Sequence, residues 1–171
     1  MAFLNTKIAL IALRLIHIIA GVLWVGGAAV LAAFVLPAAR DEKAMGYLRG
    51  LIWKRNLPRY LNIALALAIL SGLTMYGNLA ALTQGAWARS RAGMTLGVGG
   101  ALAIVAALIA TFVAAPAIHR ALELTGDASA TSPTSRPGEV ERALGRYGAS
   151  MRLVVALLVV TAGLMAVARY L

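Results

Sequence analysis

The chain contains no cysteine, and its 171 residues include only two histidines and six acidic residues. The absence of cysteine excludes disulfides, iron–sulfur clusters, thiolate-bound metals and covalently attached c-type haem. A bound metal must therefore take histidine, methionine, carboxylate or backbone oxygen as its ligands. The sequence also lacks a nucleophile and base pair, a phosphate-binding loop and a dinucleotide fingerprint. No motif of this kind indicates an enzyme class.

Charge is also scarce: charged residues make up 13% of the chain, against 61% that are hydrophobic. A helix needs about 20 apolar residues to cross a hydrocarbon core of about 30 Å. The sequence therefore predicts an all-α, polytopic membrane protein that forms one domain, a bundle of four transmembrane helices. The first run is too long for a secretory signal, so we expect it to be retained. The four spans are placed at residues 8–38, 60–84, 92–118 and 151–170.

The net charge of +10 is distributed unevenly between the connections. Six of the 16 basic residues lie between the first and second spans. Five, from Arg120 to Arg152, lie between the third span and the charge-free run that begins at Leu153, but only Arg89 and Arg91 lie between the second and third spans. By the positive-inside rule, the two basic connections face the cytoplasm and both termini lie outside. We therefore expect a multi-pass protein of the bacterial inner membrane whose charges meet anionic lipids and no nucleic acid.

The two basic connections have different patterns. In the first, Leu48 and Ile52 recur at helical spacing opposite Arg49, which predicts a short helix at the membrane interface. The second holds the run "TGDASATSPTSRPGE". Its Ser, Thr, Pro and Gly predict a linker over residues 125–138. The segment "GEVERALGRYGASMR" has the period and charge of a helix that leads into the fourth span.

The first span carries an arginine and a histidine one helical turn apart. Arg14, His17, Gly21 and Trp24 follow at steps of three or four and therefore line one face of a helix. Ionisable side chains inside a membrane are costly unless they face the bundle interior, water or a partner. Polar groups at the same depth on other spans complete a predicted pocket in the outer half of the bilayer. Its lining residues are Arg14, His17, Gly21, Trp24, Thr74, Arg91 and Met94.

His17 has two interpretations. As a neutral imidazole it would be hydrogen-bonded to a neighbouring helix, for instance to Thr74 or Asn78. As a metal ligand it would hold haem iron, because imidazole nitrogen binds iron well. His119 lies at the cytoplasmic end of its span, on the order of 20 Å or more away at 1.5 Å per residue. This separation excludes a haem held by both histidines of one chain.

The haem interpretation gives each neighbour of His17 a role. Gly21 leaves space for a macrocycle, and Arg14 pairs with a propionate. Met94 is the nearest candidate for a sixth ligand, and Trp24 is either a packing residue or a porphyrin neighbour. The predicted cofactor is haem b, held through the metal ligand His17.

The run "HIIAGVLWVGG", with the spacing H-x6-W-x-G-G, resembles the first helix of two groups of small bacterial four-helix membrane proteins. These are the HemJ-type protoporphyrinogen oxidase family and the CopD-like group. The resemblance extends through "NLPRY", "SGL" and "WARSR" to about Arg120. It implies that His17 is the haem ligand, that position 91 has a functional role and that protoporphyrinogen oxidation is the candidate enzymatic activity. Arg91 stands where the HemJ-type pattern has lysine.

Two other functions remain open beside haem or related porphyrin binding with a redox role. One is a non-catalytic accessory subunit of a larger respiratory or photosynthetic membrane complex, or a homo-oligomer. Gly93, Gly97 and Gly100 would then form its contact face, since small residues let helices approach closely in lipid. In that setting His17 binds a chlorophyll-type pigment or no cofactor. The other is CopD-like copper handling, although the methionines are scattered rather than clustered.

Overall fold

The computed structural model describes residues 7–38, 42–127 and 137–171. Within these ranges the regular elements are helices, and no strand occurs. The prediction of an all-α fold is confirmed.

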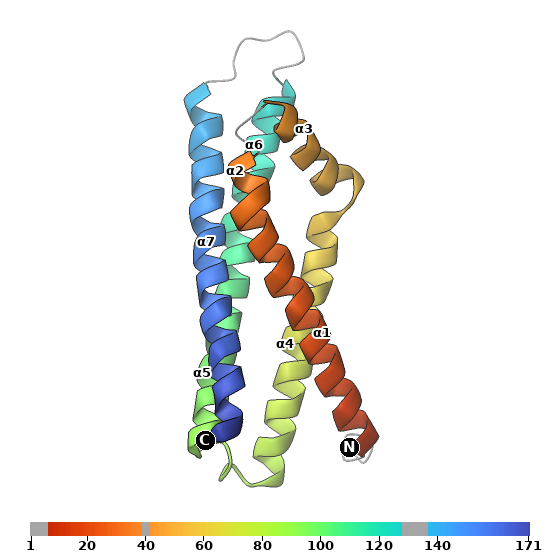
Figure 1. The fold of residues 1–171 in the computed structure, drawn as a ribbon, viewed down its shortest axis with the longest axis vertical. Coiled ribbons are helices and arrows are strands. Elements are labelled where there is room, and N and C mark those ends of the chain that lie inside the picture. Colours follow the sequence, from red (N-terminus) through yellow and green to blue (C-terminus); the bar gives the residue numbers. More distant parts are fainter. Residues whose placement is uncertain (1–6, 39–41, 128–136) are drawn as a thin grey trace. The chain divides into compact units, whose positions relative to one another are not determined.

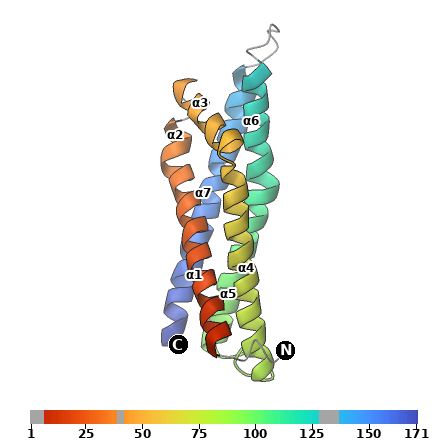
Figure 2. The ribbon, with the colours of Figure 1, turned by 90° about the vertical axis from the view of Figure 1, so that its right-hand side faces the viewer.

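Figures 1 and 2 trace the helices along the chain. Two of the long helices contain a π-helical turn, and a third ends in a 3₁₀ turn. The helix in the first connection also continues into a π-helical turn, and all of these turns carry the label η. In chain order the elements are α1 (Lys7–Val30), η2 (Leu31–Val35), α2 (Leu36–Ala38), α3 (Glu42–Arg49), η3 (Gly50–Lys54), α4 (Leu57–Leu82), α5 (Arg91–Ile109), η4 (Ala110–Ala114), α6 (Ala115–Asp127), α7 (Pro137–Val167) and η5 (Ala168–Tyr170).

Four helical stretches are long and apolar enough to cross a membrane. Their mean hydropathies lie between 1.7 and 2.5, and each contains a window of 18 residues with at most two charged side chains. The chain is therefore a multi-pass membrane protein with four spanning helices, as predicted. The stretches are Lys7–Ala38, Leu57–Leu82, Arg91–Leu124 and Gly138–Tyr170.

Several helix ends differ from the predicted spans: α4 begins at Leu57 rather than at residue 60, and the helix of α5, η4 and α6 continues to Asp127 rather than ending at residue 118. α4 ends at Leu82, before the predicted residue 84, because a turn follows at once. α7 begins at Pro137, and its charged first half confirms the helix that is predicted to lead into the fourth span at residue 151. Most of the predicted linker, residues 128–136, lies outside the described residues.

The first basic connection is helical, as its period predicts. α3 continues into η3, and Leu48 and Ile52 on this segment are buried at 1% and 7% exposure. Arg49 is exposed. The segment thus packs its apolar face on the protein and leaves its charge outside, which is the pattern of an interfacial helix.

The described chain divides into two compact units. Unit 1 consists of the chain up to Gly27, Pro58–Val105 and Leu157–Leu171. Unit 2 consists of Ala28–Leu57 and Ala106–Ala156. Unit 1 holds the first part of α1, α4, most of α5 and the end of α7, and its core includes Trp24, Ala68 and Leu158. Leu48, Leu122 and Val154 are buried in the core of unit 2.

Each π-helical turn is followed by a proline within four residues. A proline inside a helix lacks the N–H for the carbonyl four residues earlier, and its ring collides with that carbonyl. Pro37 and Pro116 lie inside helices that continue past η2 and η4, whereas Pro58 lies in the first turn of α4, after the helix of η3 has ended, and meets no such conflict. Widening the preceding turn to a π-type hydrogen bond is one way to relieve this conflict. In η4 the wider bond runs from the N–H of Ala115 to the carbonyl of Ala110.

A tight turn joins α4 to α5 in unit 1. Gln84 and Gly85 have φ angles of 50° and 79°, and the Gly85 N–H donates to the Ala80 carbonyl at 2.7 Å, which closes the end of α4. Ser90 caps α5: its hydroxyl accepts a hydrogen bond from the Gly93 N–H at 3.1 Å and donates to the Trp87 carbonyl at 2.6 Å.

Replacing Ser90 with alanine removes both of these hydrogen bonds, so we expect stability to fall by about 1 kcal/mol. Thermal unfolding of the purified protein in detergent measures the loss. Ser90→Asp keeps an oxygen acceptor at the cap and should retain most of the stability. Equal losses in the two variants would contradict a capping role.

The three glycines of the predicted contact face have different surroundings. A Cβ at Gly93 would lie 2.1 Å from the Trp87 carbonyl oxygen, and one at Gly97 would lie 3.0 Å from the Tyr76 hydroxyl. A Cβ at Gly100 would meet nothing within 4 Å. Gly93 and Gly97 therefore serve contacts inside unit 1, and only Gly100 has open space beside it.

Candidate functional site around His17

His17 packs against α4 inside unit 1, where Figure 2 shows α1 beside α4. Its Nδ1 lies 2.8 Å from the backbone carbonyl oxygen of Ala68 and 3.4 Å from the Ser71 hydroxyl. The side chain is partly buried, while Ala68 and Ser71 are buried at 5% exposure each. The imidazole therefore faces a neighbouring helix, and its position is fixed by a hydrogen bond between spans.

This contact determines which ring nitrogen carries the proton. A carbonyl oxygen can only accept, so Nδ1 of His17 is the donor to Ala68. The Ser71 hydroxyl in turn donates to the carbonyls of its own helix, to Leu67 and at 3.2 Å to Ala68. The neutral imidazole then has its lone pair on Nε2, which forms no hydrogen bond within the described residues. An Nδ1–H bonded to a carbonyl is the usual arrangement of a metal-binding histidine.

Glycines provide the space on both sides of this contact. A Cβ at Gly72 would lie 2.8 Å from Cε1 and 3.1 Å from Nδ1 of His17, so the ring can lie against α4 only because residue 72 has no side chain. One turn further along α1, a Cβ at Gly21 would meet nothing within 4 Å. The helix face next to the imidazole is therefore open at Gly21, as the haem interpretation requires.

The other predicted pocket residues are placed as follows. Arg14, one turn before His17, is exposed and forms no hydrogen bond or ion pair with another described residue. Trp24 is buried at 5% exposure and is a core residue of unit 1. Thr74 bonds the Leu70 carbonyl of its own helix at 2.7 Å, rather than His17.

Two further predicted residues lie at the start of α5. Arg91 is exposed, and its backbone carbonyl accepts a hydrogen bond from Thr95 at 2.9 Å. Met94 is 54% exposed. Neither forms a hydrogen bond with His17 in the described part of the chain, so the structure joins His17 directly to α4 alone.

The sequence places Ser71 on one stripe with Thr74 and Asn78 at the depth of His17, but it did not identify the acceptor that holds the ring. It proposed Thr74 or Asn78 as the partner, whereas the partner is the carbonyl of Ala68, assisted by Ser71. A backbone acceptor leaves no signal in a sequence. Gly72 offered a weak signal, because it lies within the "SGL" run of the family resemblance.

The motif in the first helix also has a packing role. A Cβ at Gly27 would lie 2.5 Å from Cδ2 of Leu61 on α4, while Gly26 has nothing within 4 Å. The second glycine of the motif therefore allows α1 and α4 to approach closely in unit 1.

The second histidine belongs to a different environment. His119, in unit 2, meets the ring of Trp53 edge-on, with 5.9 Å between ring centroids. No group of three or more histidine, cysteine, aspartate or glutamate side chains that could hold a metal ion occurs among residues 7–38, 42–127 and 137–171.

Comparisons with models of known protein families, with curated proteins and with solved structures find no match to this chain.

Proposed function

We propose that this chain is an integral membrane protein that binds haem b, or a related porphyrin, through Nε2 of His17. The observation that supports this most directly is the 2.8 Å contact from Nδ1 to the Ala68 carbonyl. It orients the imidazole and leaves Nε2 as the ligand atom. An iron porphyrin would supply one-electron redox chemistry, and the chain would supply the ligand and its orientation.

The surroundings of His17 suit a flat, partly charged ligand. The open side of Gly21 adjoins the imidazole on the same helix face. Arg14 lies one turn away on that face and is exposed, so its guanidinium is accessible to a propionate at the surface of unit 1. The proposal does not require Arg91 or Met94 to touch the ligand. His17 is the residue that would hold the iron porphyrin.

The uneven distribution of basic residues supports the location of the protein, and the family resemblance of its first helix supports the redox chemistry. The protein would lie in the bacterial inner membrane with both termini outside, and the haem would bind in the outer half of the bilayer. Its role there would be electron transfer or porphyrinogen oxidation.

The test is the absorption spectrum of the full chain purified in detergent and titrated with haemin. The wild-type protein is expected to show a Soret band that saturates near one haem per chain. His17→Ala should abolish it, because the axial ligand is removed. His119→Ala is the matched control, since it changes the other of the two histidines and should leave the band intact.

A folded, colourless wild-type protein after titration would refute the proposal. Equal haem binding by His17→Ala and wild type would refute His17 as the ligand. Retention of Cu(I) that depends on His17, with no haem bound, would favour copper handling instead.

A further inference from the structure

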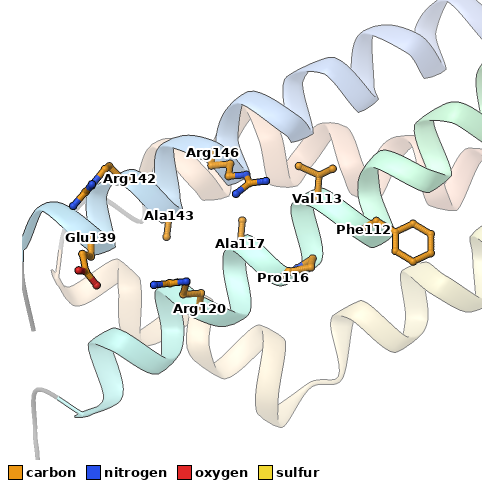
Figure 3. Close-up of a pocket in the computed structure, with 9 residues that line it drawn as sticks. All are labelled: Phe112, Val113, Pro116, Ala117, Arg120, Glu139, Arg142, Ala143 and Arg146. Atoms are coloured by element: carbon orange, nitrogen blue, oxygen red, sulfur yellow. The ribbon is translucent and has the colours of Figure 1, made fainter.

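Unit 2 contains a cavity of about 370 Å³ whose lining does not include His17. Figure 3 shows its lining side chains on α7 and on the segment formed by η4 and α6. Its walls combine three arginines and one glutamate with apolar side chains. The lining residues are Phe112, Val113, Pro116, Ala117, Arg120, Glu139, Arg142, Ala143 and Arg146.

Helical spacing explains why these residues converge. On α7, Glu139, Arg142, Ala143 and Arg146 follow at steps that keep them on one face. On the opposite wall, the lining residues from Phe112 to Arg120 are similarly spaced along one face. Ala117 and Ala143 point toward each other in Figure 3 and are buried at 8% and 9% exposure. Two small side chains at these positions leave the cavity between the helices open.

The π-helical turn contributes the apolar end of the cavity. Phe112 and Val113 belong to η4, just before Pro116, and Phe112 is 71% exposed. Going along the segment from Phe112 to Arg120, the lining changes from apolar to basic. A phospholipid matches this order, because its acyl chain is apolar and its headgroup is anionic.

The three guanidinium groups have more N–H donors than are hydrogen-bonded within the described residues. Arg142 donates its Nε–H to the Gly138 carbonyl at 2.8 Å, so the two NH₂ groups of its guanidinium remain as donors for a ligand. Arg120, Arg142 and Arg146 are all exposed. Guanidinium groups bind phosphate oxygens in a bidentate manner. Three arginines and one glutamate leave an excess of positive charge, which the negative charge of a phosphodiester would balance.

We propose that this cavity is a binding site for an anionic phospholipid. The phosphodiester lies among Arg120, Arg142 and Arg146, and an acyl chain lies along Phe112 and Val113. Basic pockets between transmembrane helices on the cytoplasmic side bind anionic headgroups in this way, and the basic connections predict that this end of the spans faces the cytoplasm. The inference is independent of haem binding at His17.

The experiment is native mass spectrometry of the full chain in detergent, with phosphatidylglycerol or phosphatidylcholine added. We expect selective retention of phosphatidylglycerol. The double variant Arg142→Gln/Arg146→Gln should bind it at least about tenfold more weakly, because each basic side chain near a lipid surface contributes about 1 kcal/mol. The matched control Arg152→Gln/Arg169→Gln also removes two exposed charges from the C-terminal helical stretch but lies outside the cavity, and should change binding less than about twofold.

Arg120→Gln tests the opposite wall separately and should weaken binding in the same direction. Circular dichroism confirms that each variant is folded. Equal retention of the two lipids, or equal loss in the cavity and control variants, would overturn the proposal. So would competition by inorganic phosphate without selectivity for phosphatidylglycerol, because the site would then be specific for the ion rather than for a lipid.

Discussion

Replacing Gly93 with alanine is expected to lower the free energy of unfolding by about 2–3 kcal/mol. The added Cβ would lie 2.1 Å from the Trp87 carbonyl oxygen and 2.8 Å from Cα of Ala88. Both are backbone atoms, so no side chain can rotate away, and the turn between α4 and α5 has to shift. The shift would also disturb the hydrogen bonds that Gly93 forms with Ser90 and Tyr76. Thermal unfolding in detergent should show a melting temperature roughly 5–10 °C lower.

Gly100→Ala is the matched control on the same helix. A Cβ there meets nothing within 4 Å, and alanine is the better helix former by about 1 kcal/mol. This variant should therefore be as stable as wild type or slightly more stable. If both variants melt together, the close contact between Gly93 and the turn does not exist in the protein.

The second large effect is expected from Gly72→Val, which should abolish the Soret band. The new Cβ would lie 2.8 Å from Cε1 of His17, so the imidazole has to move and its bond to the Ala68 carbonyl is broken. An axial ligand without this orientation binds iron more weakly, and loss of an outer-shell partner alone typically costs 10- to 100-fold in metal affinity. Haemin titration of the detergent-purified variant measures the change.

Gly77→Val serves as the control for this substitution, because it introduces the same side chain on α4 where nothing lies within 4 Å. It should retain the band. A second readout does not depend on haem: modification of His17 by diethyl pyrocarbonate, followed by mass spectrometry, should be faster in Gly72→Val. If neither readout changes, the imidazole does not lie against Gly72.

Hydropathy and helical period predicted most of the fold, and the reasons for the remaining differences are local. Arg142 and Arg146 interrupt the apolar run, so hydropathy placed the fourth span from residue 151, whereas helical period correctly predicted the helix before it. The end of α4 was placed too late because the turn holds few charged residues, so hydropathy does not mark it. Its signal is the pair Gln84 and Gly85 with positive φ, and "QG" is a weak turn signature.

The candidate site was predicted in part. The position of His17 in an apolar run correctly indicated a side chain directed at another span. The identity of its partner could not be derived, because the acceptor is the backbone carbonyl of Ala68. Arg14 shares the helix face of His17 by spacing, yet it is exposed. Spacing fixes the direction of a side chain around a helix, whereas burial depends on which neighbours are present.

The π-helical turns before Pro37 and Pro116 have a consequence for how the chain can change in length. A hydrogen bond that reaches back five residues, as from Ala115 to Ala110, encloses one residue more than an ordinary helical turn. Loss of a single amino acid within Ala110–Ala114 would shorten this loop of backbone and leave the register of the following residues unchanged. Homologous chains with a one-residue gap at this position would therefore still direct the side chains that follow η4, from Pro116 to Arg120, into the cavity.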